Sequence, residues 1–250
     1  MIKTIKTMSK QEKERYTVPR KVQDVIPVRR IWPDGIFLVG NKFSKTYKFS
    51  DINYLVASRE DKESMFLTYS ELLNSLDSGA VTKITINNRR MNQANFETSI
   101  LMPMQGDFRD EYRKEYNQML LDKATGANGI TQEKYITISV VKKDIEEARA
   151  YFARVGADLI SHFAALGSKC VELDATERLR ILHDFYRQGE ESEFVFNARE
   201  MMKRGHSFKD YICPDGIEKN SDYLKLGDKF CRVLFLKDYA SYIKDNMVTE

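Results

Sequence analysis

The stretches of the sequence that come nearest to a nucleotide-binding motif do not complete one. A P-loop needs the pattern Gly-x-x-x-x-Gly-Lys-Ser/Thr, because glycine backbones wrap their N–H groups around phosphates while the lysine neutralises charge. Lys45-Thr46 supplies such a pair, but neither required position holds a glycine, so we interpret this stretch as part of a hairpin loop. Gly126 and Gly129 lack a third glycine and follow a predicted helix, unlike a dinucleotide-binding turn. The sequence therefore predicts no cofactor.

The candidate metal ligands and nucleophiles stand alone along the chain. Zinc would require cysteines or histidines in closely spaced pairs, and the six residues of these types are widely separated: Cys170, Cys213, Cys231, His162, His183 and His206. We interpret His162 and His183 as packing residues and Cys170 as a small buried side chain, with a Cys170–histidine nucleophile pair as the weaker alternative. An odd number of distant cysteines favours a reducing compartment over a disulfide framework. We predict no metal site.

Carboxylates gather in three places, and none of the three selects a catalytic pair. The clusters are Asp107, Asp110 and Glu111; Asp144, Glu146 and Glu147; and Glu190, Glu191 and Glu193. The first two lie in the opening turns of predicted helices, where negative charge offsets the helix dipole, and the third is typical of a solvated loop. Acid–base catalysis depends on pairing in space, so an unrecognised enzyme stays an open alternative. We assign no catalytic residue and predict that this chain is not an enzyme.

An aromatic stripe between 108 and 120 has two interpretations. Tyr112 and Tyr116 beside Arg109 and Arg113 would suit base stacking with phosphate neutralisation, as in single-strand binders. Aromatic residues four positions apart on a helix are also typical of a buried face. We favour the second interpretation and predict that the following residues pack into the core: Phe108, Tyr112, Tyr116, Met119 and Leu120.

Positive charge is concentrated near the N-terminus. Residues 1–30 contain nine basic and three acidic side chains, whereas the whole chain of 250 residues has a net charge of only +3. We define residues 1–24 as a basic leader, which would attract phosphate, an anionic lipid surface or an acidic partner. The alternative is a frayed, solvated terminus. A nucleic-acid-binding module that uses this leader is the second functional hypothesis.

The remaining pattern predicts an α+β fold in which helices pack on a mixed sheet. β-Branched and aromatic runs around the turn at 32–35 predict an N-terminal antiparallel β-meander over 25–49. Apolar residues at helical spacing and capping signals predict helices beginning at Asp61, Asp107, Asp144 and Asp174. Alternating runs predict strands at 82–86, 136–140, 169–173 and 229–236, the last of them well buried. Helices between the later strands imply a crossover unit, and Gly156 suggests close packing within its helix.

The order of several segments resembles the start of the conjugal-transfer ATPases of type IV secretion systems, in the form found on integrative conjugative elements. The resemblance rests on VPRKVQD at 18–24, IWPDGIF at 31–37, YKFSDINY at 47–54 and FLTYSELLNSL at 66–76. Shorter stretches at 115–117, 134–137 and 236–239 extend it over nearly the whole chain. It is a likeness of segment order and carries no catalytic signature.

The resemblance implies a function for the chain without assigning any site residue. In that family the nucleotide-binding loop belongs to a C-terminal motor domain, and no residue of this chain matches it. It therefore implies that 25–250 form an α+β docking domain at the N-terminus of a longer, hexamer-forming motor. The expected partners are the parent motor domain and other channel subunits, with peripheral membrane association and weak nucleic-acid contact through the leader. No stretch reaches the roughly 20 apolar residues that cross a bilayer, so we expect a cytoplasmic protein at the inner membrane face.

Overall fold

The computed structural model describes residues 19–54, 56–90, 101–126, 130–191, 193–238 and 242. Within these ranges no helix is long and apolar enough to pass through a bilayer. Of the basic leader, the structure describes residues 19–24. They include the start of a short helix, α2 (Val22–Val25). The rest of the leader, 1–18, lies outside the described residues.

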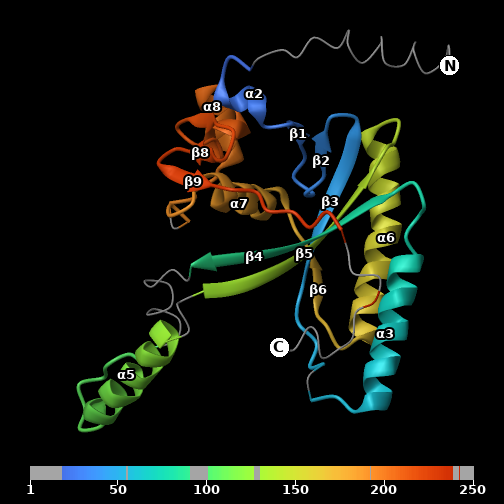
Figure 1. Ribbon diagram of the computed structural model, residues 1–250. Coiled ribbons are helices and arrows are strands. Elements are labelled where there is room, and N and C mark those ends of the chain that lie inside the picture. The colour runs from blue at the N-terminus through green and yellow to red at the C-terminus, as the bar shows by residue number, and fades with distance from the viewer. Residues whose placement is uncertain are drawn as a thin grey trace, which may run out of the picture.

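An antiparallel sheet with β3 at its centre organises the fold (Figure 1). Its strands are β1 (Val28–Ile31), β2 (Phe37–Val39), β3 (Lys42–Phe49), β4 (Val81–Arg90), β5 (Ile130–Val140) and β6 (Cys170–Glu172). β5 pairs along one edge of β3, while β2 and β6 share the other edge. The predicted α+β fold with an N-terminal meander is confirmed, although every described pairing is antiparallel and the sheet is not mixed.

The predicted crossover connects β5 to β6 through the longest helix. Both strands are antiparallel to β3, so they run parallel to each other on its two sides. The connecting helix is α6 (Ile145–Ala165), and α7 (Ala175–Tyr186) follows β6. Each begins where the sequence predicts: Asp144 accepts a hydrogen bond from the Glu147 amide, and Asp174 forms a capping box with Glu177. These caps satisfy amides that the first helical turn leaves without partners.

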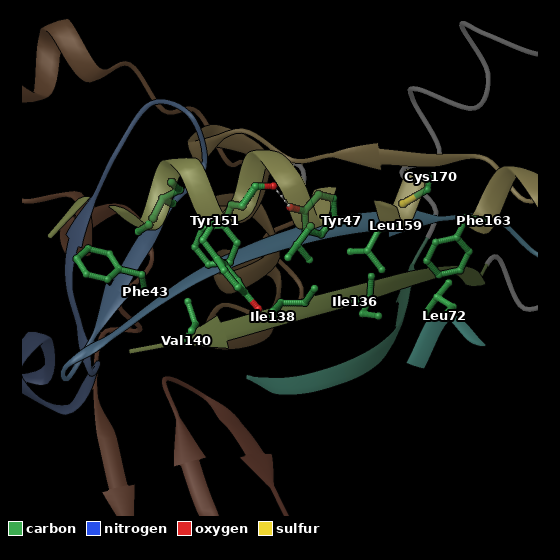
Figure 2. Packing of buried hydrophobic residues seen from close by; sticks show 14 of the residues in the cluster. Phe43, Tyr47, Leu72, Ile136, Ile138, Val140, Tyr151, Leu159, Phe163 and Cys170 are labelled. Carbon is green, nitrogen blue, oxygen red and sulfur yellow. Dashed lines mark hydrogen bonds between the residues drawn. The ribbon is translucent and has the colours of Figure 1, made fainter. Parts of the chain in front are cut away.

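One face of the sheet carries the larger hydrophobic core. α6 lies across this face beside α3 (Arg59–Asn74), as Figure 1 shows. Figure 2 shows Ile136 of β5 opposite Leu159 of α6 and Ile138 of β5 beside Tyr151 of the same helix. The Tyr47 hydroxyl donates to the backbone carbonyl of Phe152 at 3.3 Å. This core follows from the alternation of β5, which places every second side chain on the same face.

Gly156 allows α6 to approach the sheet closely, as its position in the sequence suggests. A Cβ atom there would lie 2.6 Å from Glu172 Oε1 and 2.9 Å from the Tyr47 hydroxyl. Both partners belong to strands beneath the helix, so a larger residue would push α6 away from β3 and β6.

The opposite face carries α7 and a second, smaller core. Ile26, Phe37 and Leu179 are buried there together with Ile212. The turn before β2 touches the start of α7, because the Ala175 amide donates to the Pro33 carbonyl at 3.4 Å. The other elements on this side are α8 (Ala198–Arg204), a 3₁₀ turn at Phe208–Tyr211, and a small sheet of β7 (Ile217–Lys219), β8 (Leu224–Leu226) and β9 (Lys229–Cys231).

Two strand predictions are wrong at their ends. The strand predicted at 229–236 stops at Cys231, and Leu234 and Phe235 are 85% and 81% exposed instead of buried. A run of apolar residues fits a buried strand or an exposed segment equally well when nothing in the sequence identifies its neighbour. β4 continues through Asn87-Asn88-Arg89-Arg90, where the sequence predicts its end, because β5 pairs with it as far as Ile130.

Candidate functional site

Residues 101–126, the described part of the segment between β4 and β5, form an arm that lies away from the body of the molecule. Residues 91–129 join the two strands at the end of their shared ladder, where Arg90 pairs with Ile130. The arm's helix, α5 (Asp110–Gly126), stands away from the sheet and from the other helices in Figure 1. A two-residue turn would have been enough to join antiparallel strands, so the insertion adds surface beyond what the sheet requires.

Polar contacts hold the described part of the arm in shape. Asn117 is buried and exchanges two 2.9 Å hydrogen bonds with the backbone of Met102, which fastens the preceding segment along α5. The carboxylate of Asp110 accepts from the amides of Gln105 and Gly106 at 3.1 and 2.7 Å. These bonds fix the chain that leads into the helix.

Arg113 closes the same network with two carboxylates. Its guanidinium pairs with Asp107 and, at 2.6 Å, with Asp110. The hydrogen bond from Arg113 holds the pKa of Asp107 below its ordinary value. For Asp110, the bond from the Gln105 amide comes first among the causes that lower its pKa, followed by Arg113. This arginine is therefore already neutralised within the arm.

The aromatic stripe of the arm faces solvent, so the prediction that it packs into the core is wrong. Phe108 is 82% and Tyr112 71% exposed, and Tyr116 and Met119 are also exposed. Helical spacing identifies an apolar face, but it does not say whether anything in the same chain covers that face. Exposed apolar residues gathered in one place are typical of interaction surfaces. We call Met102, Phe108, Tyr112, Tyr116 and Met119 the arm face.

The charge of the arm distinguishes a protein partner from a nucleic acid. α5 carries four acidic and three basic side chains. Of the two arginines beside the aromatic residues, Arg113 is paired with carboxylates and Arg109 lies 5.3 Å from the centre of the Phe108 ring. Single-strand binders need cations that remain available for phosphate. The arm face therefore suits an apolar protein surface better than it suits a nucleic acid.

A second concave surface lies between the sheet and α7. This groove has a volume of about 490 Å³, and its floor is the polar face of three neighbouring strands. The residues along the floor are Lys42, Ser44, Thr46, Lys83, Thr85, Asn87, Tyr135, Thr137 and Ser139. Apart from Arg178, the rest of the lining is apolar: Ile181, Leu182, Phe185 and Tyr186 of α7 form one wall, and the remaining residues are Ile26, Pro27, Val28, Phe37 and Val39.

Arg178 lies at the base of this groove and ties α7 to the meander. It is 9% exposed, and its Nη1 donates to the carbonyls of Gly35 and Ser44 at 2.7 Å each. Nη2 donates to the Ser44 hydroxyl at 3.1 Å, and the guanidinium lies 4.0 Å from the centre of the Phe37 ring. Burial lowers the pKa of Arg178 to about 9, so the side chain keeps its positive charge at neutral pH.

Next to the groove, the buried carboxylate of Glu133 pairs with two cations of the same face, Lys48 and Arg180. Glu133 accepts from Lys48 Nζ at 2.6 Å and from the Tyr135 hydroxyl at 2.7 Å, and Arg180 lies 3.6 Å away. Burial would raise the pKa of Glu133, but these hydrogen bonds and the charge of Arg180 together lower it. The same burial and the neighbouring Glu133 raise the pKa of the Tyr135 phenol.

The structure disperses the other candidate residues named from the sequence. Lys45 and Thr46 lie within β3 and not in a hairpin loop; Lys45 pairs with Glu172 at 2.5 Å. Cys170 is buried as predicted, and burial raises its thiol pKa to about 11, which disfavours the nucleophilic thiolate.

The isolated histidines and carboxylate clusters do not meet in one site either. His183 is buried against the Phe194 ring, as a packing residue would be, whereas His162 is only partly buried. Glu190 pairs with Arg187 at 2.6 Å. Among the described residues, no group of three or more His, Cys, Asp or Glu side chains could hold a metal ion.

Sequence reasoning missed the groove, although one signal for it was present. Helical spacing from Ala175 to Leu182 places Arg178 on the apolar face of α7. A cation on a buried face needs acceptors from another element, which here are backbone carbonyls that no sequence pattern identifies.

Comparison of the chain with models of known protein families and with curated proteins gives no match. The arm face and the groove are therefore interpreted from their own geometry and chemistry.

Proposed function

We propose that this chain is a non-catalytic N-terminal docking domain of a conjugative type IV secretion ATPase. In this proposal it contacts other channel subunits at the inner face of the cell membrane. The resemblance of segments 18–24, 31–37, 47–54 and 66–76 supports the family, and the exposed arm face supports the docking role. The arm face is the observation that carries the proposal.

The arm is suited to docking because its shape does not depend on its aromatic residues. Asn117 and Asp110 hold the approach to α5 through backbone hydrogen bonds, while Phe108 and Tyr112 project into solvent. A surface that is ordered before binding loses less conformational entropy when the partner arrives. Aromatic side chains are also the residues that most often dominate the energy of protein interfaces.

The test is co-purification of the tagged protein from cells that carry a complete conjugation system. We expect other secretion subunits to remain bound to the wild type and to be lost with the double variant Phe108→Ser/Tyr112→Ser. Because both side chains are exposed, the free energy of unfolding should change by less than about 0.5 kcal/mol for each substitution. Phe66→Ser is the matched control, since Phe66 is an exposed phenylalanine on another helix, α3.

Two results would contradict the docking role. One is retention of every subunit by the double variant, and the other is failure of the wild type to retain any. A calorimetric titration of the chain with Mg-ATP adds an independent check, because the proposal expects no binding heat and tight binding would contradict a non-catalytic role.

The second candidate function, nucleic-acid binding, is favoured by the charge of the leader. Binding of this kind should weaken steeply as salt rises, because phosphate contacts release counterions. Retention on DNA at low salt that disappears when residues 1–24 are deleted would support it. Retention that survives the deletion would contradict the role of the leader.

A further inference from the structure

The groove between the sheet and α7 has an excess of positive charge. Lys42, Lys83 and Arg178 line it, and no carboxylate of the described residues does. None of the three forms an ion pair with another residue in the described part of the chain. The neighbouring Glu133 is already engaged by Lys48 and Arg180. The groove therefore keeps a positive potential that an anionic group would neutralise.

Arg178 has hydrogen-bonding capacity left for such a group. A guanidinium has five N–H donors, and three of those of Arg178 are used by Gly35 and Ser44. Two N–H donors of Arg178 therefore remain, and a carboxylate accepts two hydrogen bonds when it forms a bidentate pair with an arginine. Because the side chain is 9% exposed and lines the groove, this pair would be shielded from solvent and stronger than a surface pair.

The rest of the lining specifies the body of the ligand. The floor is polar, with Ser44, Thr46, Thr137 and Ser139 along it, whereas the wall of α7 is apolar. Three of these hydroxyls are engaged within the protein, because that of Ser44 donates to the Phe37 carbonyl and accepts from Arg178, while those of Thr46 and Thr137 bond each other at 2.9 Å. A purely aliphatic chain would leave the positive charge of the groove without a counter-charge. An extended peptide fits both sides, since its backbone and acidic side chains are polar while alternate side chains point the opposite way. The volume of about 490 Å³ lies within the range of ordinary ligand sites.

We propose that this groove binds a short acidic segment of a partner protein in which carboxylates alternate with apolar side chains. The carboxylates contact Arg178, Lys42 and Lys83, and the apolar side chains contact Leu182 and Phe185. This site is separate from the arm face and does not depend on the docking role of α5.

The test is fluorescence anisotropy with a fluorescein-labelled octapeptide of alternating aspartate and leucine. We expect the wild type to bind it, with weaker binding at higher salt. The double variant Lys42→Gln/Lys83→Gln should bind about tenfold more weakly, because two charge contacts of roughly 0.7 kcal/mol each are lost. Both lysines are exposed, and neither forms an ion pair with another described residue, so the fold is expected to survive. Lys219→Gln, on β7 and outside the groove, is the matched control and should bind like the wild type.

Further peptides and variants separate the two halves of the recognition. An octapeptide with asparagine in place of aspartate should bind the wild type more weakly than the aspartate–leucine octapeptide does. The variant Phe185→Ser, which loses part of the apolar wall, should bind the aspartate–leucine octapeptide more weakly than the wild type does. The arm variant Phe108→Ser/Tyr112→Ser should bind the octapeptide like the wild type, so loss of docking and loss of groove binding are distinguishable.

Three outcomes would overturn the proposal. The first is equal affinity of the wild type and the double lysine variant for the aspartate–leucine octapeptide. The second is that the wild type binds the asparagine octapeptide as tightly as the aspartate–leucine octapeptide. The third is that octanoate displaces the bound octapeptide even when the octanoate concentration is lower than the octapeptide concentration. That result would assign the groove to small carboxylic acids.

Discussion

Substitution of Gly35 by alanine should destabilise the protein because this glycine lies against the backbone of another element. Gly35 closes the turn before β2 with a φ of +76°, and an added Cβ would lie 2.0 Å from the carbonyl oxygen of Leu173. The same glycine presents its own carbonyl to Arg178 at 2.7 Å. Alanine would therefore force the meander and the β6–α7 junction apart.

The expected magnitude has two parts. The left-handed backbone costs a residue with a Cβ about 1–2 kcal/mol. The contact with Leu173 is with backbone, which cannot rotate away, and over-packing of this kind costs about 1–3 kcal/mol. Together they predict a loss of about 2–5 kcal/mol in the free energy of unfolding.

Gly40→Ala provides the matched control. Gly40 lies in the next turn of the same meander with a φ of +61°, and a Cβ there would meet nothing within 4 Å. Gly40→Ala should therefore lose only the part of the unfolding free energy that comes from the left-handed backbone. The difference between the two variants then isolates the contact between Gly35 and Leu173.

Urea unfolding followed by circular dichroism measures both variants, with the free energy taken from the linear dependence on denaturant. We expect Gly35→Ala to be less stable than Gly40→Ala by about 1–3 kcal/mol. Equal stability of the two variants would refute the close approach of the meander to α7, and with it the geometry that places Arg178 at the base of the groove.

Two further predictions concern ionisable groups. The pKa of Glu133 is lowered in the folded state, so its contribution to stability is present above its ordinary value of 4.5 and is lost as pH falls through the folded value. Glu133→Gln should cost about 1–3 kcal/mol at pH 7, and urea titrations should show this gap closing as pH falls below 4.5 and the Glu133 carboxylate is protonated; a gap that stays constant as pH falls would contradict the charge argument. The pKa of Cys170 is raised to about 11, so its contribution to stability falls as pH rises from its ordinary value toward 11. Mass spectrometry after iodoacetamide treatment at pH 8 should find Cys231, which is only partly buried, alkylated well before Cys170, and the reverse order would contradict the burial of Cys170.

The parts of the fold that sequence predicts correctly are those in which a local signal and its tertiary role coincide. The turn at 32–35 and the caps at Asp144 and Asp174 act through neighbours only a few residues away. The apolar face of α6 is also visible in the sequence, because a helix of 21 residues samples its period several times.

The parts that sequence mispredicts depend on what a face meets. The stripe containing Phe108 and Tyr112 has the spacing of a core helix, yet the insertion between β4 and β5 carries it away from the sheet. Residues 233–236 have the composition of a strand but no strand partner among the described residues. The groove was missed because its cations come from β3, β4 and α7, which only the folded chain brings together.

Site-specific photo-crosslinking tests the docking role most directly. A benzophenone amino acid would replace Phe108 on the arm in cells that carry a complete conjugation system, with the same replacement at Phe66 as the control. The docking role predicts a crosslink to another secretion-channel subunit from position 108 and none from position 66. The absence of any crosslinked channel subunit at position 108, in a protein that accumulates normally, would contradict it.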